Sequence, residues 1–102
     1  MFNADPRLPS SKELIVLNML ASRREMYGLE MVQASGGKLA RGTVYVTLMR
    51  MEDKGYVTSK QLKDDRVSGL PKRVFSITGL GQRALAATRS ASSALLGAGA
   101  LV

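Results

Sequence analysis

Two short runs in the second half of the chain alternate apolar and polar side chains with a period of two. Residues 56–62 read YVTSKQL and residues 72–77 read KRVFSI, and both are rich in the residue types that favour strands. The segment between them is polar and contains Gly69 and Pro71. This pattern predicts a β-hairpin with a long tip.

The segment before the hairpin begins with a predicted helix over residues 10–22, SSKELIVLNMLAS. Ser10 and Glu13 have the spacing of a capping box, in which each side chain satisfies a backbone amide of the first turn. The apolar residues form a wide stripe, so we expect this helix to be largely buried. A second, shorter helix is predicted over residues 26–35, and the glycine pair that follows would end it.

A third helix is predicted over residues 41–54 and ends at Gly55, because glycine adopts the left-handed conformation that closes a helix. Val44, Leu48 and Met51 have the spacing of one buried face. Several β-branched residues in the segment would also suit a strand. The helical spacing and the glycine stop favour the helix.

After the hairpin, Thr78 occupies an N-cap position and a fourth helix is predicted over residues 79–96. One face of this helix carries small and apolar residues: Leu80, Ala84, Ala87, Ala91 and Leu95. Small residues let two helices approach closely, so we expect this face to pair with a second copy of the chain. The alternative is that the helix packs on its own domain.

The chain contains neither cysteine nor histidine. Disulfides, thiolate metal sites and imidazole acid–base chemistry are therefore excluded. Its eight acidic residues form no paired-carboxylate pattern. We expect a protein that is not an enzyme and that has no metal site and no cofactor.

The net charge is +7, from 15 basic and 8 acidic residues, and no acidic residue follows Asp65. A basic single domain is expected to bind a polyanion, first of all nucleic acid, although solubility is an alternative role for part of the charge. No apolar stretch approaches the roughly 20 residues of a membrane span, and residues 1–9 lack the pattern of a signal peptide. We therefore expect a cytoplasmic protein without a membrane partner.

The predicted order is helix, helix, helix, strand, strand, helix, which is typical of a winged helix-turn-helix. We predict a mainly α fold with a small β-hairpin. Residues 1–78 would form the winged helix-turn-helix DNA-binding domain, and residues 79–102 a C-terminal dimerisation helix of the same domain. A chain of 102 residues fits one such domain.

Residues 41–57, RGTVYVTLMRMEDKGYV, and residues 69–85, GLPKRVFSITGLGQRAL, resemble the PadR family of bacterial transcription regulators. The matching positions are Thr43, Val44, Tyr45, Leu48, Arg50, Met51, Glu52, Lys54 and Gly55, then Pro71, Arg73, Phe75, Thr78, Gly81 and Leu85, with Tyr27-Gly28 in the second helix. The likeness spans roughly residues 12–87. The chain departs from the pattern at Val46, where the family often has proline.

The resemblance implies a sequence-specific regulator, a repressor that binds palindromic double-stranded DNA as a homodimer built from the first and last helices. The residues expected to contact DNA are Lys38, Arg41, Thr43, Tyr45, Thr47, Arg50, Arg66, Lys72 and Arg73.

The third helix would present its early residues to the major groove. Arg41 is the candidate for gripping guanine with two hydrogen bonds, and a phosphate contact or a solvated end residue is the alternative. Thr43 either caps the helix or binds phosphate. Tyr45 is expected to be half-buried with its hydroxyl near the DNA backbone, or else to belong to the core. Thr47 and Arg50 are expected to face away from the apolar stripe.

Lys72 and Arg73, at the start of the second strand, would reach the minor groove beside the hairpin, as would Arg66 at its tip. Two other functions remain open, a protein-interaction adaptor and an RNA-binding protein, although few aromatic residues are present for stacking on RNA. A small-molecule effector stays unidentified. Met26, Met31, Met49 and Met51 are expected to fill the core, and no tryptophan is present to stack on a flat ligand.

Overall fold

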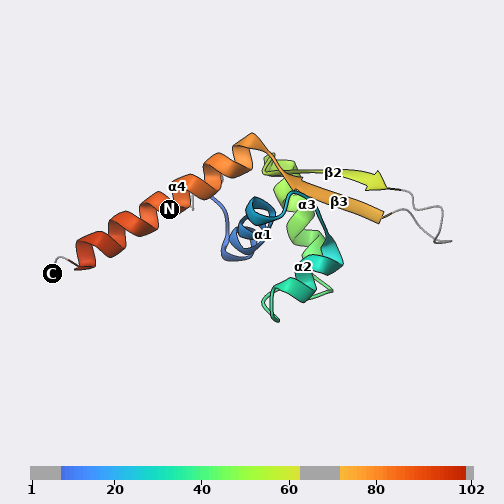
Figure 1. Ribbon diagram of the computed structural model, residues 1–102, viewed down its shortest axis with the longest axis horizontal. Helices are drawn as coiled ribbons and strands as arrows, with labels where there is room; N and C mark the ends of the chain where they lie inside the picture. The colour runs from blue at the N-terminus through green and yellow to red at the C-terminus, as the bar shows by residue number, and fades with distance from the viewer. Residues whose placement is uncertain (1–7, 63–71, 101–102) are drawn as a thin grey trace, which may run out of the picture.

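The computed structural model describes residues 8–62 and 72–100, and it describes side chains only as far as Ala91. Its elements are α1 (Ser11–Ser22), β1 (Met26–Tyr27), α2 (Gly28–Ala34), α3 (Val44–Lys54), β2 (Val57–Leu62), β3 (Lys72–Ile77) and α4 (Gly79–Ala100). The first three helices and the sheet form one body, and α4 projects away from it (Figure 1). The predicted mainly α winged helix-turn-helix fold is confirmed.

The capping box predicted for α1 is present. The backbone N–H of Ser10 donates to Glu13 Oε1 at 2.8 Å, and the N–H of Glu13 donates to Ser10 Oγ at 3.2 Å. The helix buries Val16, Leu17 and Leu20. It packs against α3, α4 and β3, and it therefore lies at the centre of the core.

The sheet has three antiparallel strands in the order β1-β3-β2, one more than the predicted hairpin. Met26 and Tyr27, predicted as the start of the second helix, instead pair with Phe75 and Val74 of β3. The second helix begins at Gly28. Tyr27 is its N-cap residue, and the N–H of Tyr27 donates to the Glu30 carboxylate at 2.7 Å. The prediction was wrong at these two residues because their partner strand lies far along the chain.

Helix α3 begins at Val44, three residues later than predicted. The N–H groups of Thr43 and Val44 both donate to the Ala40 carbonyl, so the preceding residues form a turn. The Thr43 side chain makes no cap hydrogen bond and donates to that same carbonyl, so the expected cap is absent. Gly55 closes the helix as predicted, with φ at +83°.

The core joins α1, α3, the sheet and the first turns of α4. The predicted buried face of α3 is confirmed, because Val44, Leu48 and Met51 are fully buried. Met26 and Met31 also lie in the core. Met49 is 65% exposed, so its prediction as core filling was wrong.

Helix α4 is capped by Thr78, whose Oγ1 accepts from the N–H of Gly81 at 3.0 Å and donates to the Gly55 carbonyl at 2.5 Å. The helix continues to Ala100, beyond the predicted end at residue 96. Its buried hydrophobic residues, Ala84 and Leu85, pack into the core of the same domain. Arg89 hydrogen-bonds Asn18 and so ties α4 to α1.

The stripe predicted for dimerisation on α4 is therefore divided. Ala84 is buried within its own domain, which corrects the expectation that it faces a partner. Leu80, Ala87 and Ala91 are exposed. The side chain of Leu95 lies outside the described residues.

Candidate DNA-binding surface

The outer face of α3 is the centre of the candidate surface. Four residues of this helix point inward, namely Val44, Thr47, Leu48 and Met51. Its exposed residues in the first two turns are Tyr45, Val46, Met49 and Arg50. Because residues three and four apart share a helix face, these four side chains form one continuous outer patch.

Tyr45 belongs to this patch and is 45% exposed, which agrees with the expectation that it is half-buried. Its ring lies against Gly28 at the start of α2, so its orientation is set by α2. Arg50 is exposed on the opposite flank of α3. Thr47 differs from expectation: it is only 9% exposed, and its Oγ1 donates to the Thr43 carbonyl at 3.3 Å.

The turn between α2 and α3 supplies three more of the predicted residues. Lys38, Arg41 and Thr43 are all exposed there. The turn is anchored by Leu39, which is buried, and whose N–H donates to Ser35 Oγ at 3.0 Å. The two cations therefore stand ahead of the first turn of α3, where a helix entering the major groove meets the DNA backbone.

The hairpin formed by β2 and β3, which we call the wing, carries Lys72 and Arg73 at the start of β3, both exposed. The Lys72 ammonium lies 5.3 Å from the centre of the Tyr27 ring. Arg73 Nη1 donates to Ser59 Oγ at 2.9 Å, and Ser59 Oγ donates to Glu52 Oε2 at 2.8 Å. This chain of hydrogen bonds joins the wing to α3. Arg66, expected at the tip, lies outside the described residues.

A groove of about 560 Å³ lies between the sheet and helices α2 and α3. Its lining residues come from α2, α3 and the sheet: Tyr27, Leu29, Glu30, Gln33, Tyr45, Lys72 and Arg73. The structure therefore brings Tyr45 together with Lys72 and Arg73, two of the three cations predicted for the wing.

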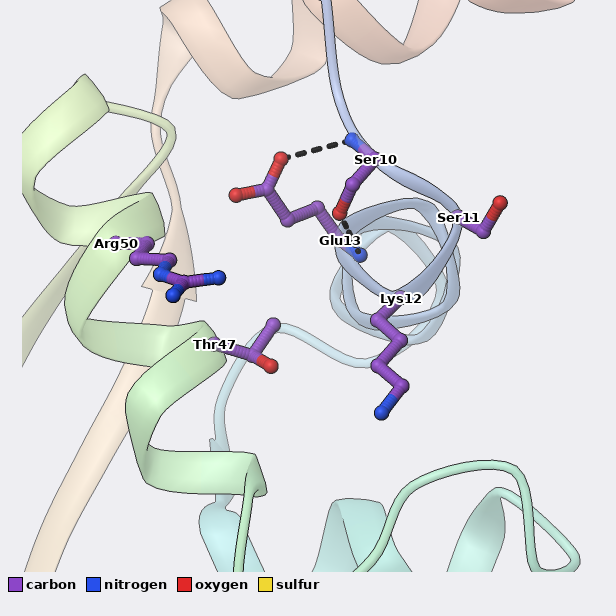
Figure 2. Close-up of a pocket in the computed structure, with 6 residues that line it drawn as sticks. All are labelled: Ser10, Ser11, Lys12, Glu13, Thr47 and Arg50. Atoms are coloured by element: carbon purple, nitrogen blue, oxygen red, sulfur yellow. Dashed lines mark hydrogen bonds between the residues drawn. The ribbon is translucent and has the colours of Figure 1, made fainter.

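A second recess, lined by residues with polar or charged side chains, lies on the other side of α3, between α3 and the start of α1 (Figure 2). Lys12 and Arg50 both line it, from the two helices. Sequence reasoning did not select Lys12. Only a weak signal was available, because a lysine in the first turn of a helix opposes the helix dipole and gains nothing from it.

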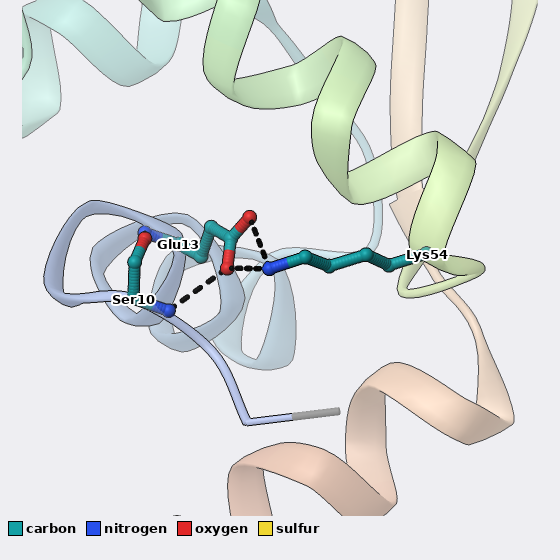
Figure 3. Close-up of polar contacts among 3 residues, drawn as sticks. All are labelled: Ser10, Glu13 and Lys54. Carbon is teal, nitrogen blue, oxygen red and sulfur yellow. Dashed lines mark hydrogen bonds and ion pairs between the residues drawn. The ribbon is translucent and has the colours of Figure 1, made fainter. Parts of the chain in front are cut away.

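Glu13 also lines this recess, but its carboxylate is already paired (Figure 3). Lys54 Nζ lies 2.8 Å from Oε1 and 3.1 Å from Oε2, and the N–H of Ser10 donates to Oε1. The carboxylate side chain is 3% exposed. Because Lys54 balances Glu13, the charges of Lys12 and Arg50 remain available to an approaching anion.

The order of these elements and the sequence across them match a known family. The family model for the transcriptional regulator PadR-like family matches residues 16–87, which is most of the chain. The chain belongs to the PadR-like family. Members of this family are transcriptional regulators, which agrees with the expectation that the protein is not an enzyme. A search of curated proteins found no match.

Solved structures share the PadR-like fold. A transcriptional regulator from Thermoplasma acidophilum is 25% identical, with a TM-score of 0.70 over 83% of this chain and 82% of that one. A PadR family regulator from Clostridium difficile is 21% identical, with a TM-score of 0.74 over 87% and 94% of the two chains.

Bacillus subtilis PadR, crystallised with operator DNA, is 18% identical, with a TM-score of 0.63 over 74% of this chain and 44% of that one. At 21% and 18% identity, the Clostridium and Bacillus structures establish a shared fold.

Within residues 8–62 and 72–100, no cluster of acidic residues could hold a metal ion. No helix in the same ranges is long and apolar enough to cross a membrane.

Proposed function

We propose that this PadR-like regulator is a repressor that binds palindromic double-stranded DNA as a homodimer. Helix α3 would enter the major groove, and the wing would lie over the adjacent minor groove. The observation that carries the proposal is the convergence of cations on the two flanks of α3. Arg50 and Lys12 line the recess on one flank, and Lys72 and Arg73 line the groove on the other.

The contacts would divide by chemistry. Lys12, Arg50, Lys72 and Arg73 would neutralise phosphates, while Arg41 would reach a base edge or a phosphate from the turn. The Tyr45 hydroxyl would donate to a phosphate. Thr43, Lys38 and Arg66 remain proposed contacts, and Thr47 has little exposed surface for one.

The dimer would form through α4. Ala87 and Ala91 are exposed on a helix that projects from the body, and small side chains allow a second helix to approach closely (Figure 1). A twofold dimer would place two α3 helices about one turn of DNA apart, and it would therefore read a palindrome. A repressor of this kind would act in the cytoplasm, where the DNA is.

The test is a selection of duplexes bound by the full chain from a randomised pool, with the oligomeric state measured by analytical ultracentrifugation. We expect a dimer and an enriched palindrome with half-sites about one helical turn apart. Replacing Ala87 with glutamate should yield monomers and weaken binding to the selected duplex. The absence of any enriched duplex, together with no retention on random duplex at low salt, would favour a protein-interaction adaptor instead.

Repression is tested separately, with a reporter gene placed behind the selected duplex. Expression of the chain should lower reporter output, and Arg73→Ala should restore it. Higher output in the presence of the chain would identify an activator.

A further inference from the structure

Two large apolar side chains occupy the centre of the outer face of α3. Val46 is 49% exposed and Met49 is 65% exposed. They are three residues apart and therefore adjacent on the helix surface, opposite the buried face formed by Val44, Leu48 and Met51. Sequence reasoning placed Met49 in the core and regarded Val46 as a departure from the family pattern.

These two residues contribute little to the stability of the domain, because about half or more of each side chain is in water. Exposed apolar groups gathered at one point of a surface typically mark a binding site. Here the neighbours indicate the occupant. Arg50 lies on one flank of the pair. On the other flank, Met49 shares a recess with Arg73 and with Glu52, whose carboxylate accepts from the same Ser59 hydroxyl that holds Arg73. An apolar pair between cations suits a ligand that is anionic at its edges and apolar between them.

The major groove of DNA has this character. Phosphates border it on both sides, and the thymine C5-methyl is an apolar group on its floor. Resting on the proposed DNA-binding function, we propose that Val46 and Met49 contact thymine methyl groups and thereby select A·T pairs at defined positions of each half-site.

The charge pattern along α3 limits which residues approach the DNA. Asp53 is exposed near the C-terminal end of α3, where phosphates would repel it. Glu52, next to it, is already linked through Ser59 to Arg73. Val46 and Met49 precede these acids, in the part of the helix that enters the groove. Tyr45 and Arg50, beside them, would hold the phosphates and leave the apolar pair facing the bases.

The test replaces each thymine of the selected duplex, one at a time, with deoxyuridine, which removes only the methyl group. The wild-type chain should bind about 4-fold more weakly at one or two positions of each half-site, the value for one buried methyl-sized group. Substitution at the other positions should leave the affinity unchanged.

Two variants identify the contacting side chain. Met49→Ala and Val46→Ala should each bind the thymine duplex more weakly and lose discrimination against deoxyuridine at one position. Arg50→Ala is the matched control from the same helix face: it should weaken binding to both duplexes and keep their ratio. Circular dichroism should show all three variants folded, because the truncated side chains are exposed.

The outcomes separate the two proposals. If the wild-type chain enriches a duplex but deoxyuridine has no effect at any position, methyl recognition is overturned and DNA binding stands. Unchanged affinity of both apolar variants for the thymine duplex would also overturn methyl recognition and assign the pair to another occupant, such as a protein. If no duplex is enriched, both proposals fail.

Discussion

The ring of Tyr45 lies directly on Gly28. A Cβ atom at Gly28 would stand 2.8 Å from Cε1 and Cζ of the ring and 2.9 Å from its hydroxyl oxygen. Gly28 is the first residue of α2, and Tyr45 is the second residue of α3. The glycine therefore makes room for the tyrosine at the proposed DNA surface. This contact gives a physical reason for both residues in the PadR-like pattern.

Replacing Gly28 with alanine is expected to displace the Tyr45 ring. The ring is at the end of a half-exposed side chain, so it can swing outward, and the domain should lose at most about 1 kcal/mol of stability. DNA affinity should fall, because the hydroxyl loses its position. Fluorescence anisotropy with the selected duplex measures the loss, and urea unfolding measures the stability.

Gly79→Ala is the control for this prediction. Gly79 is the first residue of α4, has only the far end of Arg83 within 4 Å of an added Cβ and has no positive φ. It should leave DNA affinity unchanged. The double variant Gly28→Ala/Tyr45→Ala should bind no more weakly than Tyr45→Ala, since both changes remove the same contact. Additive losses would show that Gly28 acts independently of the tyrosine.

Arg73→Ala is expected to weaken binding to every duplex and to reduce the salt dependence of binding by about one phosphate. The reason is that Arg73 is exposed on the wing and would neutralise phosphate without reading bases. Measuring log affinity against log salt concentration, on the selected and on random duplexes, checks both parts.

Arg83→Ala removes the same charge from α4 and should leave the salt slope unchanged. Ser59→Ala is a finer probe, because Ser59 links Arg73 to Glu52. It should weaken binding less than Arg73→Ala does, since the guanidinium stays but loses its fixed position. An unchanged affinity and salt slope for Arg73→Ala would remove the wing from the DNA interface.

Features encoded by neighbouring residues were predictable from the sequence. The capping box of Ser10 and Glu13, the glycine stop at Gly55 and the buried spacing of α3 all depend on residues within a turn or two of one another. Strand β1 was not predictable in this way. Its two residues form a strand because they pair with β3, almost fifty residues later.

The candidate surface was predicted less completely, because a helix stripe shows which side chains share a face but not how far the partner elements cover it. Helix α1 covers the Thr47 flank of α3, so Thr47 is buried, while the neighbours of Met49 leave it 65% exposed. For the same reason, Ala84 belongs to the core although it shares a stripe with exposed Ala87. The division at residue 78 and the DNA contacts themselves remain predictions.

Lys54→Met is expected to destabilise the domain by about 2 kcal/mol. The change leaves the buried Glu13 carboxylate without its cation, and breaking a fully buried pair costs about 3–5 kcal/mol. The lower value allows for Lys54, whose side chain is 32% exposed. Urea unfolding followed by circular dichroism gives the free energy.

The double variant Glu13→Gln/Lys54→Met should recover most of this loss. The double variant removes the Glu13 charge together with the Lys54 charge, and the glutamine oxygen can still accept from the N–H of Ser10. Equal stability of the single and double variants would mean that water, and not Lys54, compensates the Glu13 charge.

Gly81→Ala is expected to destabilise the domain and Gly79→Ala is not, although both add a methyl group to the first turn of α4. A Cβ at Gly81 would overlap the backbone carbonyl of Tyr56 and lie 2.9 Å from Ile77 Cγ1. The carbonyl accepts from the N–H of Thr78 at 3.0 Å and cannot move without breaking this hydrogen bond. Helix α4 must therefore shift, and such overpacking typically costs about 1–3 kcal/mol.

At Gly79 the nearest atom is the far end of Arg83, 3.4 Å away, and alanine should be neutral or stabilise the helix by about 0.5 kcal/mol. The urea midpoint of Gly81→Ala should therefore lie below the wild-type value, and that of Gly79→Ala at or above it. Because α4 would shift, the Gly81→Ala variant should also dimerise more weakly, as measured by analytical ultracentrifugation. Matching midpoints for the two variants would mean that the first turn of α4 is not held against Tyr56 in solution.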